Sequence, residues 1–206
     1  MIRIVICDDH PVVREGLASV LGRRPDLKIV AAVGSVGELV TAAEKLKPDV
    51  VLLDLELPDS SGVNAIERLG RAAPAAKVVM FTVHDAEDTV RAALKAGAMG
   101  YVQKGARADE IAAAIREVHA GRSYIQGHVA ATVFAGLQRR PAASGLSARQ
   151  LEVLRLIAGG RSNKQIATSL DITERTVKFH VAAIMDKLDV DNRAQAAAAA
   201  TRRRLL

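Results

Sequence analysis

Short apolar, β-branched runs alternate with amphipathic segments through the first 120 residues of this 206-residue chain. The apolar runs predict buried strands at residues 2–7, 28–33, 50–53, 78–81 and 101–102. The segments between and after them predict helices at residues 12–21, 37–46, 63–72, 86–96 and 109–120. Repeated strand–helix units favour the α/β class with a doubly wound parallel sheet. We predict a five-stranded sheet with the flavodoxin-like order 2-1-3-4-5.

The strand pattern stops near residue 121, and a different organisation follows. Residues 121–145 are rich in glycine and contain Pro141 and an Arg139-Arg140 pair, which indicates a linker with one short helix at 128–137. Helical patterns then cover residues 147–158, 163–170, 174–188 and 193–203. Ser147 with Gln150, and Ser162 with Gln165, have the spacing of capping boxes. We therefore predict a first domain at 1–120, a linker at 121–145 and a small all-helical domain at 146–206.

Charge is divided unevenly between these parts. Residues 1–120 carry 15 Lys and Arg against 17 Asp and Glu, whereas residues 121–206 carry 14 against 6. A basic helical domain suggests a polyanionic partner, most often nucleic acid. Cys7 is the only cysteine, which excludes an internal disulfide, and no apolar run approaches the roughly 18 residues that a membrane span requires. We expect a cytoplasmic protein without a membrane segment.

Polar residues stand where the predicted strands end. Asp8 and Asp9 follow the first strand, Asp54 the third, Thr82 the fourth and Lys104 the fifth. Sheets of this kind bind ligands at the carboxyl ends of their strands, so these side chains are expected in one pocket. Clustered carboxylates must take up protons or bind a hard cation such as Mg²⁺.

With these residues, positions 1–120 resemble the receiver domain of bacterial two-component response regulators. The resemblance implies that Asp54 accepts a phosphoryl group from a histidine kinase. It also implies that Asp8, Asp9 and Asp54 hold Mg²⁺ together with the backbone carbonyl of Glu56. His10 is interpreted as a loop or cap residue rather than a metal ligand.

The same resemblance assigns the remaining polar positions. Lys104 matches the lysine that pairs with the phosphoryl group, Thr82 the hydroxyl that moves to bond it, and Tyr101 the switch aromatic that turns inward. Many receivers have proline after this lysine, whereas Gly105 stands here. His84 lies near Thr82 and could touch the phosphoryl site, but the favoured interpretation is a solvated loop histidine.

The predicted helix at 174–188 has two distinct faces. At about 100° per residue, one side presents Val177, Val181, Ile184 and Leu188, and the other presents Arg175, Lys178, Phe179 and Ala182. The preceding helix and a short turn complete a helix-turn-helix, whose second helix enters the major groove of DNA.

Three stretches of the helical domain resemble the LuxR-type DNA-binding domain: Leu146-Ser147-Ala148-Arg149-Gln150, Ser162-Asn163-Lys164-Gln165-Ile166-Ala167 and Thr176-Val177-Lys178-Phe179-His180-Val181. The whole chain is therefore similar to the NarL/FixJ family of response regulators. Base-reading positions map onto Lys178, Phe179 and Ala182, and Arg175 and Thr176 are further candidate DNA contacts. The resemblance implies a regulator rather than an enzyme, which binds double-stranded promoter DNA and forms a homodimer when phosphorylated.

Three other interpretations are less favourable. A haloacid dehalogenase-type enzyme also uses a strand-end aspartate with Mg²⁺, but it needs a second aspartate where Glu56 stands, and its nucleophile normally follows the first strand. A ligand-sensing LuxR regulator would leave the strand-end polar residues unexplained. A receiver-like regulator that works without phosphorylation conflicts with the complete acidic set.

Overall fold

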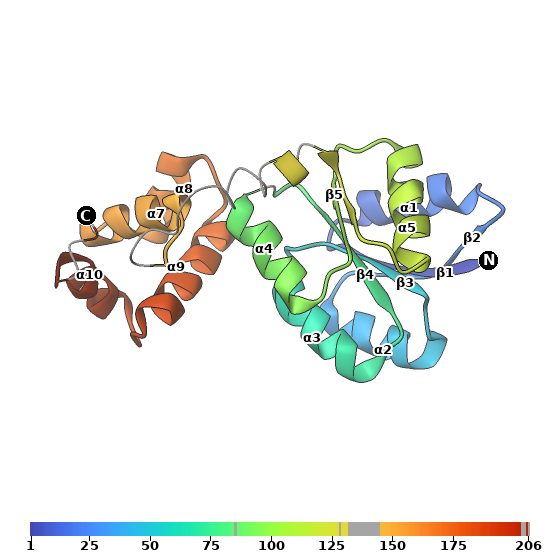
Figure 1. Ribbon diagram of the computed structural model, residues 1–206, viewed down its shortest axis with the longest axis horizontal. Helices are drawn as coiled ribbons and strands as arrows, with labels where there is room; N and C mark the ends of the chain where they lie inside the picture. Colours follow the sequence, from blue (N-terminus) through green and yellow to red (C-terminus); the bar gives the residue numbers. More distant parts are fainter. Residues whose placement is uncertain (85, 128, 132–144, 203–204, 206) are drawn as a thin grey trace. The chain divides into compact units, whose positions relative to one another are not determined.

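A computed structural model describes residues 1–206 except 85, 128, 132–144, 203–204 and 206 (Figure 1). The chain divides into two compact units, Met1–Gln138 and Arg139–Leu206. Within the described residues, no helix combines the length and apolar character that crossing a membrane would require.

The first unit is built on one parallel sheet. Its strands are β1 (Ile2–Cys7), β2 (Leu27–Val33), β3 (Val50–Leu53), β4 (Lys77–Thr82), β5 (Gly100–Gln103) and β6 (Tyr124–Ile125). They lie in the order β2-β1-β3-β4-β5-β6. The predicted α/β class and the order 2-1-3-4-5 are confirmed for the first five strands, with ends displaced by at most a residue or two.

Helices cover both faces of this sheet. They are α1 (Pro11–Gly22), α2 (Val36–Leu46), α3 (Gly62–Ala72), α4 (Glu87–Ala96) and α5 (Ala108–His119). Because successive strand residues point to opposite faces, Val5 and Cys7 pack with α2, α3 and α4, whereas Ile4 and Ile6 pack with α1 and α5. Figure 1 shows α1 and α5 on one side of the sheet, with α2 and α3 on the other. Two apolar layers therefore hold the strand ends in place.

The sixth strand was not predicted. Tyr124 and Ile125 pair in parallel with Gly100 and Tyr101 of β5, so these two residues of the predicted linker extend the sheet. A two-residue strand is too short to produce an alternating pattern, and glycines on either side favour a turn. The predicted helix at 128–137 falls mostly outside the described residues.

The second unit contains α7 (Ala148–Ala158), α8 (Asn163–Leu170), α9 (Glu174–Leu188) and α10 (Arg193–Arg202). Its core is a separate apolar cluster that includes Val153, Ile166 and Ile184. Both predicted capping boxes are confirmed. Ser147 Oγ accepts the N–H of Gln150 at 3.1 Å, and Ser162 Oγ accepts the N–H of Gln165 at 3.3 Å.

Candidate functional site

Three charged side chains meet at the carboxyl edge of the sheet. Asp8 follows β1, Asp54 follows β3 and Lys104 follows β5. Lys104 Nζ lies 2.7 Å from Asp8 Oδ2 and 2.8 Å from Asp54 Oδ2, so one ammonium group bridges two carboxylates. Asp8 and Asp54 are only 1% and 3% exposed. The structure thus brings together three of the residues that the sequence analysis assigned to one pocket.

The electrostatics of this trio are set by burial. Burial raises the pKa of Asp54, although Lys104 and the N–H of Leu55, which donates to Asp54 Oδ1 at 2.7 Å, act to lower it. Burial acts to lower the pKa of Lys104, but its contacts with Asp54 and Asp8 outweigh that effect and raise it. The lysine therefore stays charged, while the Asp54 carboxylate is poorly solvated and gains from any additional positive charge.

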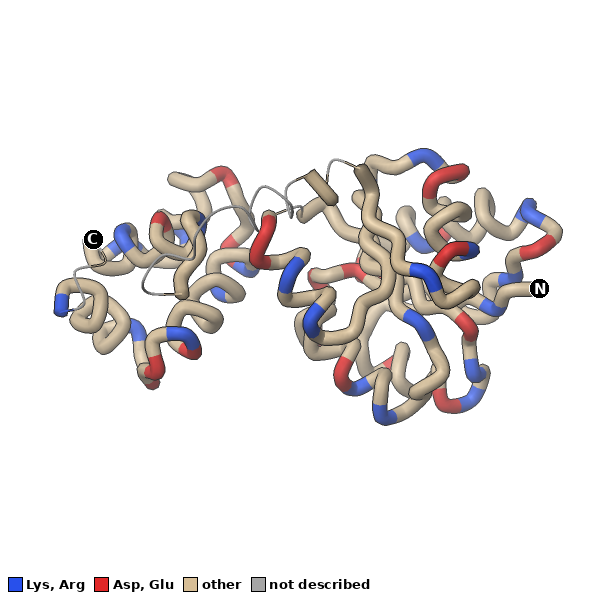
Figure 2. The backbone as a smooth tube through the Cα atoms, viewed as in Figure 1, with Lys and Arg blue, Asp and Glu red and all other residues tan. Residues whose placement is uncertain are grey.

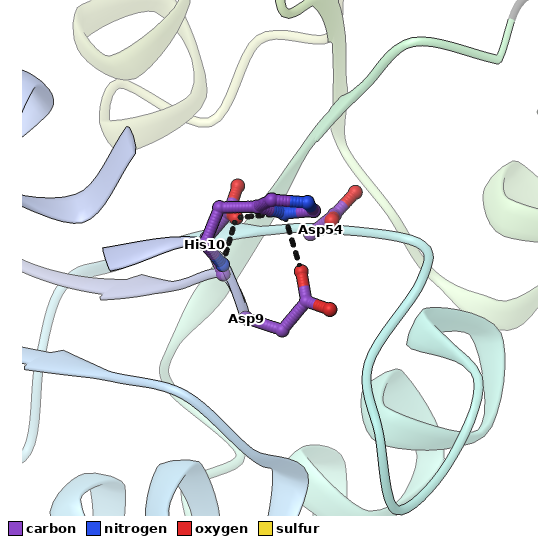
Figure 3. Close-up of side chains that lie close together, drawn as sticks. Asp9, His10 and Asp54 are labelled. Carbon is purple, nitrogen blue, oxygen red and sulfur yellow. Dashed lines mark hydrogen bonds and ion pairs between the residues drawn. The ribbon is translucent and has the colours of Figure 1, made fainter. Parts of the chain in front are cut away.

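Asp9 and His10 complete an acidic cluster beside the trio. One ligand atom from each of Asp8, Asp9, His10 and Asp54 lies within 4.8 Å of the others. His10 Nδ1 is 2.6 Å from Asp9 Oδ1 and 3.3 Å from Asp8 Oδ1, and Figure 3 shows its ring turned toward the carboxylates. Carboxylate oxygens dominate this donor set, which suits a hard cation such as Mg²⁺. His10 also occupies the N-cap position of α1, although its side chain makes no capping hydrogen bond there.

The segment that follows Asp54 is held closely against α3. The N–H of Gly62, the first residue of α3, donates to the carbonyl of Leu55 at 2.7 Å. A Cβ at position 62 would lie 2.4 Å from the backbone oxygen of Asp54 and 2.8 Å from Leu55 Cα. Only glycine fits this approach. Glu56 and Ser61 form an antiparallel bridge that closes the intervening loop.

Thr82 and Tyr101 are both fully buried. The Thr82 hydroxyl oxygen accepts the N–H of His84 at 3.3 Å, and the Tyr101 hydroxyl donates to the His84 carbonyl at 2.7 Å. His84 Nε2 lies 3.1 Å from Glu56 Oε1, and the His84 side chain is 14% exposed. The interpretation of His84 as a solvated loop residue is therefore wrong, because its side chain is mostly buried and lies against Glu56.

The DNA-facing residues predicted on α9 fall into three groups. Lys178 and Ala182 are exposed, and Arg175 and Phe179 are partly exposed. Thr176 is 8% exposed, and its hydroxyl lies 2.8 Å from that of Thr173, the N-cap residue of α9. The opposite face of α9 is buried in the core of the second unit.

Sequence reasoning misjudged His84 and missed two further residues near the site, Gly62 and Asp59. Both carboxylate oxygens of Asp59 accept backbone N–H groups at the start of α2, from Val36 and Gly37 at 2.9 Å each. His84 and Asp59 act through contacts between segments far apart in the sequence, whereas Gly62 approaches the nearby Asp54 and Leu55. Of these residues, only Gly62 could have been identified from the local sequence, because it stands in the first turn of a helix directly after the serine N-cap.

Family models match both units. The response regulator receiver domain matches residues 4–116, and the luxR family of bacterial regulatory proteins matches residues 144–200. The chain is 36% identical over 205 residues to the DNA-binding transcriptional activator DevR/DosR of Mycobacterium tuberculosis, covering 98% of this chain and 94% of that protein. It is 38% identical over 210 residues to the transcriptional regulatory protein LiaR of Bacillus subtilis, covering 100% of both.

Solved structures give the same family. The crystal structure of the response regulator ChrA, of a heme-sensing two-component system, aligns with a TM-score of 0.56 at 36% identity and covers 100% of this chain and 98% of that one. A LuxR-family two-component response regulator from Aurantimonas aligns with a TM-score of 0.65 at 33% identity, covering 68% of this chain and 99% of that one. With its acidic strand-end site and its helix-turn-helix unit, the chain belongs to the family of two-component response regulators that join a receiver domain to a LuxR-type DNA-binding domain.

Proposed function

We propose that Asp54 is the phosphoacceptor of this response regulator and that its phosphorylation controls binding of promoter DNA by α9. The observation that carries the proposal is the Lys104 ammonium group bridging Asp8 and Asp54, at 2.7 and 2.8 Å, in the receiver unit. A buried nucleophilic carboxylate beside one fixed cation has the arrangement that phosphoryl transfer needs.

In the proposed transfer, an Asp54 oxygen attacks the phosphorus of a phosphohistidine on the partner kinase. The new P–O bond forms as the P–N bond breaks, and the kinase imidazole leaves with the electron pair of that bond. Lys104, already 2.8 Å from Asp54 Oδ2, neutralises charge on the transferring phosphoryl oxygens. The Leu55 N–H on Asp54 Oδ1 fixes the carboxylate plane, so that the other oxygen faces the lysine.

The residues present fit a magnesium ion. Asp8, Asp9 and Asp54 would supply carboxylate oxygens from the acidic cluster. The resemblance to receiver domains implies the backbone carbonyl of Glu56 as the remaining protein ligand. When bound, Mg²⁺ supplies positive charge to phosphoryl oxygens and orients them for in-line displacement.

The proposed output passes through Thr82 and Tyr101. A phosphoryl group on Asp54 would attract the Thr82 hydroxyl, which now accepts the N–H of His84. Tyr101 packs in the core beside β4, so a rearrangement at Thr82 changes the packing of this part of the receiver. Phosphorylation acts as a population shift, limited by how much better the phosphoryl group fits the active arrangement.

DNA binding is proposed for the exposed side of α9, with Lys178, Phe179 and Ala182 at the bases and Arg175 near the start of the helix. Thr176 is buried and is not included in this surface, contrary to the expectation from the sequence. Its support is the LuxR-type match, the relative named as a DNA-binding activator, and the excess of Lys and Arg over Asp and Glu in the sequence of residues 121–206. Figure 2 marks the Lys and Arg of the described helices in blue, interspersed with Asp and Glu in red. The partners we propose are a sensor histidine kinase, double-stranded promoter DNA and a second copy of the chain, in the cytoplasm. Pairing would match two half-sites about one DNA turn apart.

The test uses the full chain, a small phosphodonor and Mg²⁺, with intact mass as the readout. We expect one added phosphoryl group that requires the metal and is absent from Asp54→Ala. Asp26→Asn is the matched control, because Asp26 lies at the opposite end of the strands, where its carbonyl accepts the N–H of Ile2. Undiminished labelling of Asp54→Ala would remove Asp54 as the acceptor.

DNA sites are then selected from a random library with the phosphorylated protein. Affinity for a recovered site is compared with and without the phosphodonor. We expect tighter binding after phosphorylation of the wild type and no change for Asp54→Ala. Equal affinities for the wild type in both states would contradict control by the receiver.

A further inference from the structure

His84 contacts three residues that come from separate parts of the receiver. Its backbone N–H donates to Thr82 Oγ1 at 3.3 Å, its carbonyl accepts the Tyr101 hydroxyl at 2.7 Å, and its Nε2 lies 3.1 Å from Glu56 Oε1. Thr82 ends β4, Tyr101 belongs to β5, and Glu56 follows Asp54 by two positions. A single residue therefore touches the predicted switch hydroxyl, the predicted switch aromatic and the loop of the predicted phosphoacceptor.

The contact with Glu56 is shielded from water. The two side chains are 14% and 25% exposed, and Tyr101 is fully buried. Both side chains are therefore confined by their surroundings, and they form an ion pair only when the imidazole is protonated.

The loop that carries Glu56 is short and held at several points. Asp54 and Glu56 are separated only by Leu55, whose carbonyl accepts the N–H of Gly62, and Glu56 itself bridges to Ser61. A shift at Asp54 therefore moves Glu56 with it, because the intervening backbone has little freedom to absorb the change.

We propose that His84 is a positioning residue that couples the phosphoacceptor loop to Tyr101 through its side-chain contact with Glu56. The inference rests on the proposed function and adds a second connection to the one through Thr82. Glu56 fixes the imidazole, the imidazole fixes the His84 backbone, and the His84 carbonyl holds the Tyr101 hydroxyl. A change at Asp54 reaches Tyr101 along this chain of contacts even where the Thr82 hydroxyl has not moved.

The substitution His84→Ala isolates the side-chain contact. Alanine retains the backbone N–H and carbonyl that meet Thr82 and Tyr101, and it removes only the imidazole. Val83→Ala is the matched control, because Val83 is the neighbouring residue and its side chain is 64% exposed. Glu56→Gln tests the same contact from the other side without altering residue 84, so the test does not depend on one variant folding.

The chain offers a direct readout of Tyr101. It has no tryptophan and two tyrosines, so Tyr124→Phe leaves Tyr101 as its only tyrosine. In this background the full chain is titrated with beryllium fluoride and Mg²⁺ as a phosphoryl mimic. Fluorine NMR follows binding of the mimic, and ring NMR of labelled tyrosine follows Tyr101.

We expect Tyr101 to respond to the mimic in the parent and in Val83→Ala. His84→Ala should bind the mimic and lose the Tyr101 response, and Glu56→Gln should reduce it. A full Tyr101 response in His84→Ala would overturn the inference, as would an equal loss in Val83→Ala. The fluorine signal tests the proposed function separately from the Tyr101 signal. If the parent does not bind the mimic, or binds it equally well without Asp54, the proposed function itself fails.

A double-mutant cycle supplies a second criterion, because coupling between two sites is reciprocal. If His84 carries the connection, Tyr101→Phe changes the affinity for the mimic in the parent but not in His84→Ala. Because the cycle substitutes Tyr101 itself, the affinity for the mimic is measured by fluorine NMR rather than by the Tyr101 signal. Additive effects of the two substitutions would overturn the inference.

Discussion

Gly62→Ala is expected to destabilise the receiver and also to displace the backbone of Asp54. The added Cβ would stand 2.4 Å from the Asp54 carbonyl oxygen and 2.8 Å from Leu55 Cα. Non-bonded contacts to carbon normally lie near 3.5–4.0 Å, so the start of α3 must move outward by roughly 1 Å. Both neighbours are backbone atoms, so no side-chain rotation can relieve the overlap.

The magnitude follows from two opposing effects. Overpacking of this kind costs about 1–3 kcal/mol, whereas replacing glycine by alanine restricts the unfolded chain and returns about 0.4–1 kcal/mol. We expect a net loss of about 1–2 kcal/mol. Gly70→Ala in the same helix is the matched control, because a Cβ there would meet nothing within 4 Å. It should stabilise the receiver by about 0.4–1 kcal/mol.

Urea unfolding of the full chain measures both variants. Tyrosine fluorescence reports the receiver transition selectively, because Tyr101 and Tyr124 both lie in the first unit. The rate of labelling by a small phosphodonor is measured on the same samples in the absence of urea. Gly62→Ala should label more slowly, and Gly70→Ala should match the wild type. If both substitutions changed the free energy of unfolding equally, the close approach at Gly62 would have no energetic consequence.

Three further predictions concern Asp54 and the helical unit. Burial, opposed by Lys104, raises the pKa of Asp54 above its ordinary value of 3.8. The folded state therefore binds more protons than the unfolded state, and the free-energy cost of burying this carboxylate disappears as pH falls through the raised pKa. Asp54→Asn should therefore exceed the wild type in urea stability at neutral pH and lose that advantage on acidification, and a difference that did not vary with pH would contradict this. Lys178→Ala should weaken binding to a selected DNA site by about 1–3 kcal/mol if Lys178 reads a base. Unchanged affinity at fixed salt would place this residue outside the interface. Ser162→Ala should lower the stability of the helical unit by about 1 kcal/mol in circular dichroism melts, and Ser169→Ala, later in α8, should not.

Much of the fold was predictable because its signals are local. The buried strands of a parallel sheet are continuous apolar runs, and β1 and β3 begin and end at the predicted residues. Both capping boxes depend on residues three apart, so sequence alone defines them. By contrast, β6 exists only because β5 offers an open edge, which no pattern within residues 124–125 encodes.

Part of the site was also predictable from the sequence, because it follows from the order of the strands. Parallel strands bring their carboxyl ends to one edge, so Asp8, Asp54 and Lys104 meet wherever the topology is correct. The contacts of His84 could not be predicted in this way. They depend on the path of two loops and on the depth of Tyr101, which are properties of packing rather than of strand order.

The charge balance explains why such a site can be both stable and responsive. The buried carboxylates of Asp8 and Asp54 share one ammonium group at Lys104, and the partly exposed Asp9 lies beside them, which leaves a formal charge of −2 at this edge. Burying charge without full compensation is costly, so this edge of the sheet contributes less to stability than an apolar edge would. A divalent cation would balance the formal charge, and a phosphoryl group would then disturb that balance again. The deficit of positive charge destabilises the resting site. For the same reason, binding of a cation or a phosphoryl group changes the free energy of the site strongly, and a population shift requires such a change to differ between the two conformations.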